Sequence, residues 1–238
     1  APPLLYGRTE GSTPFRLSLH VGDVGHTLVV GPTGAGKSVL LALMALQFRR
    51  YNRSQVFAFD FGGSIRAASL AMGGDWHDLG GGLTEGSESS VSLQPLGRIH
   101  DTYERAWAAD WIVAILLREG IKITPEAKEH IWTALTSLAS APVGERTITG
   151  LSVLLQSNEL KQALRPYCVG GPYGRLLDAE AEHLGSADVQ AFEIEGLVGT
   201  GAAPAVLAYL FHRIGDRLDG RPTLLIIDEG WLALDDEG

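Results

Sequence analysis

The sequence predicts an α/β fold with a mostly parallel central sheet that is interrupted by an all-helical insertion. Apolar runs of strand length alternate with amphipathic helices near both ends of the chain, whereas the middle shows only helical periodicity. With 238 residues, 45% hydrophobic and 20% charged, the chain has the composition of a globular protein that can bury a substantial core.

Residues 1–92 are predicted to form the first part of the core. An apolar strand over Thr27–Val30 precedes a helix over Lys37–Arg49, and a second apolar strand follows over Val56–Phe59. The segment Phe15–His20 alternates apolar and polar side chains, which suits a half-exposed flanking strand. Strands that alternate with helices in this way favour parallel pairing.

A Gly- and Ser-rich segment, residues 73–90, is expected to be a flexible loop. Residues 93–185 then form a mainly helical insertion, in which Thr124 caps a helix that has Pro125 at its first position. The buried face of the preceding helix is marked by Trp107, Trp111 and Ile115. Further helices are expected around Leu151–Leu155 and Leu160–Leu164.

Residues 186–238 are predicted to return to the core. Phe192–Glu195 alternates like a strand, and an apolar stripe at helical spacing runs over Ala203–Leu218. The continuous apolar run Leu224–Ile227 is typical of a strand that is covered on both faces.

The charge balance argues against a nucleic-acid partner. Net charge is −9, from 28 acidic and 19 basic residues, whereas phosphate neutralisation usually requires a basic surplus. A few basic residues that line a pore would still suffice to hold DNA.

The one cysteine, Cys168, excludes an internal disulfide and fits a reducing compartment. The chain has no basic and apolar leader at its start, and no run reaches the roughly 18 apolar residues of a spanning helix. Because it begins without Met and stops at Gly238, soon after an apolar strand, an excised domain is the expectation.

One motif predicts a phosphate-binding loop. It fits G-x-x-x-x-G-K-[ST] in full, with Gly31, Pro32, Thr33, Gly34, Ala35, Gly36, Lys37 and Ser38. The glycines let backbone N–H groups point at phosphate oxygens, and the following helix directs its positive end at the same anion. Lys37 is expected to reach the β- and γ-phosphates and Ser38 to bind Mg²⁺. A Gly-rich surface turn is the alternative, but the strand–loop–helix context favours the Walker A loop.

A second motif follows the apolar run 224–227. Asp228 is expected to hold Mg²⁺, and Glu229 to polarise the attacking water as general base, which is the Walker B pattern. The alternative is a buried strand whose acidic end meets solvent. Neither Asn52 nor Asn158 begins the Asn-Lys-x-Asp of a GTPase, so ATP is favoured over GTP.

Asp60 ends a predicted strand, where parallel sheets form their ligand crevice. A place near the nucleotide and a role as turn former or helix cap are equally compatible with its position. The seven His residues show no H-x-x-x-H pairing, so their spacing does not predict a metal site beyond Ser38 and Asp228. Arg146, Arg165 and Arg175 are open candidates for an arginine finger.

Six ordered stretches carry a resemblance to the large ATPases of type IV secretion and conjugal transfer, the TrbE-like and VirB-type family. They span almost the whole chain and are residues 25–39 (GHTLVVGPTGAGKSV), 56–66 (VFAFDFGGSIR), 93–96 (LQPL), 167–178 (YCVGGPYGRLLD), 192–197 (FEIEGL) and 224–231 (LLIIDEGW).

This resemblance implies a C-terminal, RecA-like P-loop motor domain that binds ATP and Mg²⁺ and works as a homo-oligomer, expected to be a hexamer. It implies a place at the cytoplasmic face of the bacterial inner membrane, beside other secretion ATPases and inner-membrane components, and a role in pilus assembly or substrate translocation.

The family's N-terminal domain has no counterpart here. The same resemblance implies truncation after the Walker B strand, with loss of a sheet strand and its polar sensor, so weak or no ATP turnover is expected from the chain alone. A DNA-translocating motor of the coupling-protein or FtsK/HerA kind and a nucleotide-gated assembly scaffold are the alternatives.

Overall fold

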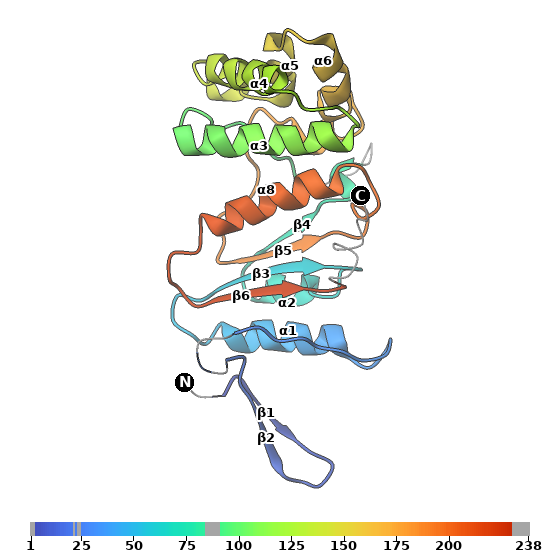
Figure 1. The fold of residues 1–238 in the computed structure, drawn as a ribbon. Coiled ribbons are helices and arrows are strands. Elements are labelled where there is room, and N and C mark those ends of the chain that lie inside the picture. The colour runs from blue at the N-terminus through green and yellow to red at the C-terminus, as the bar shows by residue number, and fades with distance from the viewer. Residues whose placement is uncertain (1–2, 21, 23–24, 84–90, 230–238) are drawn as a thin grey trace. The chain divides into compact units, whose positions relative to one another are not determined.

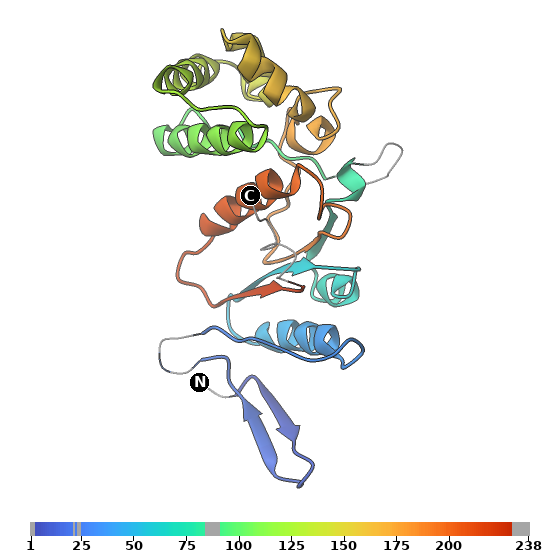
Figure 2. The same cartoon turned by 45° about the vertical axis from the view of Figure 1, so that its right-hand side comes forward.

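The computed structural model describes residues 3–20, 22, 25–83 and 91–229, and they form two compact units (Figures 1 and 2). The core unit comprises Ala1–His77, Ser186–Glu195 and Leu218–Gly238, and the helical unit comprises Asp78–Gly185 and Gly196–Arg217. Residues 196–217, assigned to the returning core from the sequence, thus group with the helical unit.

The core unit is built on a four-stranded sheet of order β4-β5-β3-β6. Its strands are β3 (Gln55–Asp60), β4 (Asp75–Asp78), β5 (Val189–Glu193) and β6 (Thr223–Ile227). Strand β3 pairs in parallel with both β5 and β6, and all six of its residues are buried. Parallel strands with β3 between two neighbours confirm the predicted type of sheet.

Helix α1 (Lys37–Phe48) packs against this sheet, and the short helix α2 (Arg66–Ala71) follows β3. Met44, Ala45 and Phe48 bury one side of α1 in a cluster with Val56 and Ala58 of β3. Because residues 44, 45 and 48 share one helical face, their burial fixes α1 beside the strand that leads to its own ligand edge.

A separate antiparallel hairpin precedes this sheet, formed by β1 (Leu5–Arg8) and β2 (Pro14–Leu17) (Figure 2). The predicted flanking strand over Phe15–His20 is therefore present in part, as β2. Its partner β1 was not predicted.

The strand predicted over Thr27–Val30 is a correction, since the structure has no strand there. Leu28 and Val30 are 87% and 82% exposed. Apolar strand-like sequence forms a strand only when a neighbour supplies the hydrogen-bond ladder, and no described residue pairs with this segment as a strand.

Strand β6 differs from its prediction in a related way. Its run of apolar residues was expected to be covered on both faces, but Leu225 and Ile227 are each 43% exposed. In the described ranges of the chain β6 pairs on one side only, with β3. The other predicted core strands, over Val56–Phe59 and Phe192–Glu195, correspond to β3 and, with a shift towards the N-terminus, to β5.

Within the predicted loop 73–90, residues 75–78 form strand β4 and Gly81–Leu83 a short 3-10 turn, η1; residues 84–90 lie outside the described ranges. The Gly-rich flanks hid a short strand. The alternating burial needed to detect it extends over only four residues.

The helical unit contains α3 (Thr102–Arg118), α4 (Pro125–Leu138), α5 (Ile148–Leu154), α6 (Asn158–Leu164), α7 (Gly174–Leu177) and α8 (Ala203–Gly215), with short turns η2 (Val143–Glu145) and η3 (Arg165–Tyr167). Thr124 caps α4 as predicted, because its Oγ1 accepts a hydrogen bond from the N–H of Ala127 at 3.1 Å. None of the helices in the described ranges has the length and apolar character needed to cross a bilayer.

His77 in β4 makes the stability of the core unit sensitive to pH. The side chain is buried against the ring of Phe192, with ring centroids 5.4 Å apart. Burial lowers the pKa of His77 below its usual 6.5, against an opposing effect of Asp75. Below pH 6.5 the unfolded chain therefore binds the proton more readily than the folded chain, and acidification favours unfolding.

We expect the free energy of unfolding to fall as the pH is lowered from 7.5 to about 5.5, by about 1.4 kcal/mol for each unit by which the pKa is lowered. Urea titrations at both pH values measure this fall. His77→Phe should reduce it, whereas His26→Phe at an exposed position should not. An identical fall in the wild type and in His77→Phe would contradict the assignment.

Candidate functional site

The loop over residues 31–36 leads directly into α1. Gly34 and Gly36 have φ angles of 80° and 85°, a left-handed conformation that favours glycine. Gly36 is the N-cap residue and supplies no side-chain hydrogen bond. The first N–H groups of a helix have no partner within the helix, so this end of α1 is suited to an anion.

Lys37 is folded back onto this loop. Its Nζ donates to the carbonyl oxygen of Gly31 at 3.1 Å and to that of Pro32 at 3.3 Å. The ammonium group therefore lies within the loop that the motif assigned to phosphate, and a ligand would receive it by a change of side-chain rotamer.

Ser38 and Asp228 meet although 190 positions separate them in the sequence. Ser38 Oγ donates to Asp228 Oδ2 at 3.0 Å, and the Asp228 side chain comes from the residue that follows β6. The N–H of Asp228 donates to the carbonyl of Phe59 at 2.9 Å, which ties the end of β6 to the end of β3. The fold thus brings the two motifs together at one edge of the sheet. Hydroxyl and carboxylate oxygens are suitable ligands for Mg²⁺.

Glu229 extends this edge by one residue. It has a φ angle of 48° and is partly exposed, and its N–H donates to Asp228 Oδ1 at 3.1 Å. A non-glycine residue in this conformation is uncommon and costs free energy. The turn at Glu229 directs the chain away from the strand directly after the two acids.

Asp60 lies at the same edge and is 1% exposed. Its carboxylate accepts hydrogen bonds from Ser64 Oγ and, at 2.9 Å, from the N–H of Ile65. These contacts are those of a turn former. However, Asp60 and Ser64 also line one narrow crevice with Ser38 and Asp228, so both interpretations of Asp60 are compatible with the structure.

The chain is similar to proteins of conjugation and type IV secretion. It is 47% identical over 234 residues to a probable conjugal transfer protein TrbE of Sinorhizobium fredii, covering 98% of this chain and 35% of that protein. It is 46% identical over 237 residues to the conjugal transfer protein TrbE of Rhizobium radiobacter, covering 98% and 28% respectively. A virB4 protein of Bartonella henselae is 27% identical over 236 residues. The chain belongs to the family of the TrbE and VirB4 proteins.

A solved structure agrees with this TrbE/VirB4 membership at the level of fold. The structure of VirB4 of Thermoanaerobacter pseudethanolicus matches with a TM-score of 0.67 and 17% identity, covering 97% of this chain and 68% of that one. No family model matches the sequence. The chain spans about a third of the length of the two TrbE relatives.

Sequence reasoning missed one residue beside the site of this TrbE/VirB4 homologue. Glu193, the last residue of β5, accepts hydrogen bonds from the N–H groups of Gly62 at 3.1 Å, of Gly63, and of Glu195 at 2.9 Å. Gly62 and Gly63 have φ angles of 82° and 68°, a succession that turns N–H groups towards one anion. Glu193 therefore fixes the loop after Asp60. Only its place in the stretch FEIEGL could have indicated it.

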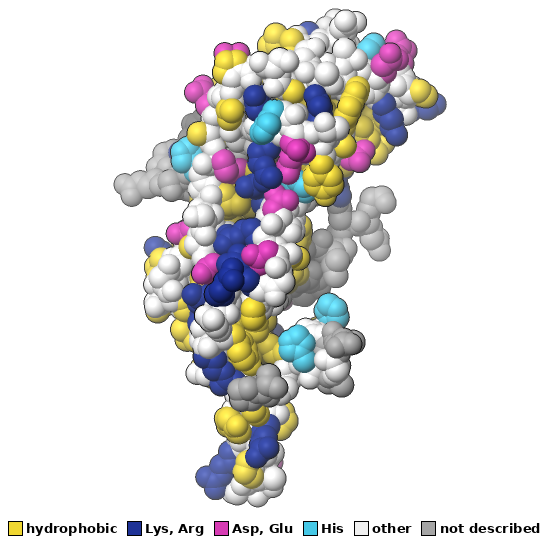
Figure 3. Space-filling view, turned by 90° about the vertical axis from the view of Figure 1, so that its left-hand side faces the viewer, with side chains coloured by type: hydrophobic (Ala, Val, Ile, Leu, Met, Phe, Trp, Pro, Cys, Tyr) yellow, Lys and Arg dark blue, Asp and Glu magenta, His cyan; other side chains and the backbone are white. Residues whose placement is uncertain are grey.

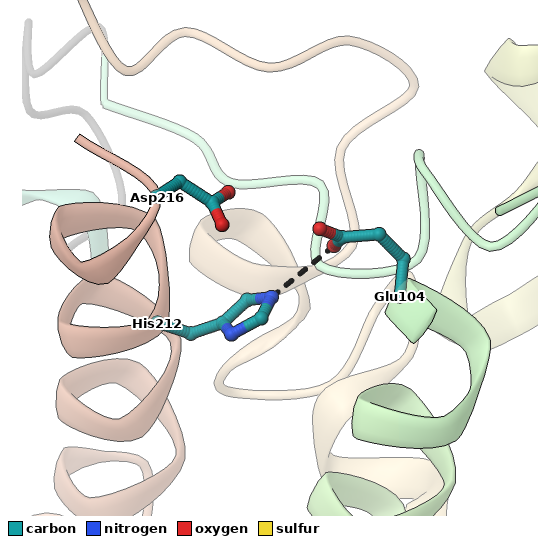
Figure 4. A group of neighbouring side chains, drawn as sticks. All are labelled: Glu104, His212 and Asp216. Carbon is teal, nitrogen blue, oxygen red and sulfur yellow. Dashed lines mark hydrogen bonds and ion pairs between the residues drawn. The ribbon is translucent and has the colours of Figure 1, made fainter. Parts of the chain in front are cut away.

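A second group was also missed, and Figure 4 shows it. Glu104, His212 and Asp216 place ligand-type atoms within 4.8 Å of one another, with His212 Nε2 at 3.2 Å from Glu104 Oε2. Arg98, however, contacts the carboxylate of Glu104 at 3.1 Å and that of Asp216 at 2.6 Å. The guanidinium already supplies the positive charge between these carboxylates, so this group is an ion-pair network that joins α3 to α8.

The candidate arginine fingers differ in their surroundings. Arg146 donates to the carbonyl oxygens of Ala141 and Gly97 at 3.0 and 3.2 Å and so braces its own unit. Arg165 and Arg175 are exposed. The structure contains one copy of the TrbE/VirB4 chain and selects none of them for a neighbour's site.

Proposed function

We propose that this chain binds ATP with Mg²⁺ and hydrolyses it as the motor domain of a conjugal transfer or type IV secretion ATPase. The observation that carries the proposal is the 3.0 Å contact between Ser38 of the phosphate-binding loop and Asp228 at the end of β6. A Walker A hydroxyl and a Walker B carboxylate need this proximity to share one metal ion.

Each residue has a role in this proposal. The N–H groups at the start of α1 would hold phosphate oxygens, and Lys37 would turn from the carbonyls of residues 31 and 32 towards the β- and γ-phosphates. Ser38 and Asp228 would hold Mg²⁺, and Glu229 would take a proton from water. The bound nucleotide supplies the phosphoanhydride bond that water cleaves.

The family membership supports the wider proposal. A RecA-like core, a homo-oligomer of hexameric type, contacts with other secretion ATPases and inner-membrane components, and a place at the cytoplasmic face of the inner membrane are all proposals for the protein that contains this chain. The DNA-translocating alternative has less support, because Lys and Arg side chains are interspersed with Asp and Glu on the face shown in Figure 3 and the net charge is −9. Stimulation of hydrolysis by DNA would favour that alternative.

Binding of a fluorescent ATP analogue to the 238-residue chain tests the proposal. Lys37→Ala should weaken binding at least about tenfold, which corresponds to about 1.4 kcal/mol, because it removes the phosphate-facing charge. Asp228→Asn should remove most of the dependence on Mg²⁺. Lys128→Ala, at an exposed position of α4, is the matched control and should bind as the wild type does. Equal affinity in the wild type and Lys37→Ala would refute the site.

A further inference from the structure

A cavity of about 290 Å³ opens in the helical unit, between α5, α6 and the turn that follows α6. Its walls include Ser152, Val153, Lys161, Arg165, Cys168 and Val169. A volume of about 300 Å³ is at the lower end of the range for ligand sites, and it is large enough for an aliphatic side chain with a neighbouring carboxylate. The stretch YCVGGPYGRLLD contributes residues 168 and 169, and the proposed ATPase function gives this stretch no role.

The backbone holds one apolar side chain out towards solvent at this cavity. Asp178 is 5% exposed, and its carboxylate accepts hydrogen bonds from the N–H of Thr149 at 3.0 Å and from the N–H of Val169 at 2.7 Å. Val169 is nevertheless 73% exposed, and Val153 across the cavity is 72% exposed. A buried carboxylate thus anchors the backbone of a residue whose apolar side chain remains in water. This arrangement suits a surface that another molecule covers.

The same cavity carries an unbalanced positive charge. Lys161 and Arg165 both line it, and within the described ranges neither forms an ion pair with an acidic side chain. The chain as a whole has a net charge of −9. These two cations beside exposed valines therefore stand out locally from an acidic background, and they would attract a ligand that is both acidic and apolar.

We propose that this cavity, with its rim of Val153, Lys161, Arg165 and Val169, docks an acidic, apolar peptide segment of a partner protein. An aliphatic side chain enters between the two valines, and flanking carboxylates pair with Lys161 and Arg165. A peptide fits better than a nucleic acid or an anionic membrane, because those polyanions bind through many cations, whereas this site has two cations and an apolar wall.

Fluorescence anisotropy with labelled, capped peptides tests the proposal on the intact chain. The probes are Glu-Leu-Asp-Leu-Glu, the same peptide with serine in place of leucine, and Lys-Leu-Lys-Leu-Lys. We expect the acidic leucine peptide to bind at least about tenfold more tightly than either of the others. Equal binding of all three, no binding of the acidic leucine peptide, or tighter binding of single-stranded DNA or phosphatidylserine vesicles would overturn the proposal.

Two variants separate the charge from the apolar contribution. Lys161→Glu/Arg165→Glu should abolish binding of the acidic peptide and permit binding of the basic one, and Val169→Ser should weaken the acidic peptide several-fold. Lys122→Glu/Lys128→Glu makes the same charge change at exposed positions and should leave binding unchanged. Loss of binding to the same extent in this control would show a general effect of net charge and refute the site.

Cys168 supplies an independent readout, because it is the one thiol of the chain and lines the cavity. Burial raises the pKa of Cys168, so its reaction with a maleimide is followed at pH 8.5, where the thiolate fraction is larger. Saturating acidic peptide should slow this reaction several-fold, whereas the serine peptide should not. An unchanged rate with bound acidic peptide would place the peptide elsewhere.

Discussion

Glu229→Gln is expected to lower the rate of ATP hydrolysis about 100-fold or more while Mg²⁺–ATP binding persists. The proposed role of Glu229 is to accept a proton from the attacking water, and an amide of the same shape cannot do so. A 100-fold loss corresponds to about 2.7 kcal/mol in the activation free energy. The measurement is steady-state phosphate release by the protein at its natural full length, with and without DNA.

The comparison with Lys37→Ala makes this prediction specific. Lys37→Ala should lose binding and hydrolysis together, whereas Glu229→Gln should lose hydrolysis alone. If Glu229→Gln hydrolysed ATP at the wild-type rate, Glu229 would not be the general base. If Glu229→Gln left secretion intact while Lys37→Ala abolished assembly, a nucleotide-gated scaffold would explain the protein better than a motor.

Gly174→Ala is expected to destabilise the helical unit by about 2–3 kcal/mol. A Cβ atom at Gly174 would lie well under 3.0 Å from the carbonyl oxygen of Cys168. Because this oxygen belongs to the backbone, the turn before α7 would have to move to relieve the clash. Thermal unfolding followed by circular dichroism measures the effect, together with the free energy of unfolding from urea titration.

Gly215→Ala is the matched control in the same unit. Gly215 ends α8, and an added Cβ atom would have no neighbour within 4 Å. Alanine there should stabilise the helix by up to about 1 kcal/mol, because glycine is a poorer helix former. Destabilisation by Gly215→Ala as large as that by Gly174→Ala would show that the effect does not come from the close approach to Cys168.

Local signals predicted much of this fold. The glycines of the phosphate-binding loop need positive φ angles, the cap at Thr124 needs a side-chain acceptor, and the apolar run before Asp228 needs a strand. Each of these requirements is met within a few residues of sequence, and each was found. The predicted meeting of Ser38 with Asp228 combined two such signals with the rule that parallel strands end at one edge.

Features that depend on distant partners were missed. Whether Thr27–Val30 becomes a strand depends on a neighbour, and its own residues give no information about that neighbour. The bonds of Glu193 to Gly62 and Gly63 span about 130 positions, and Glu104 and His212 are 108 positions apart. Periodicity describes one element at a time, so it cannot indicate such pairs.

The one-sided pairing of β6 affects how the chain behaves at high concentration. Peptide groups along the other side of the strand have no ladder partner among the described strands, and Leu225 and Ile227 lie half-exposed beside them. Such an edge can recruit an extended segment from another molecule. Purified chain is therefore best kept dilute and cold, since crowding would encourage intermolecular β-sheet and eventual precipitation.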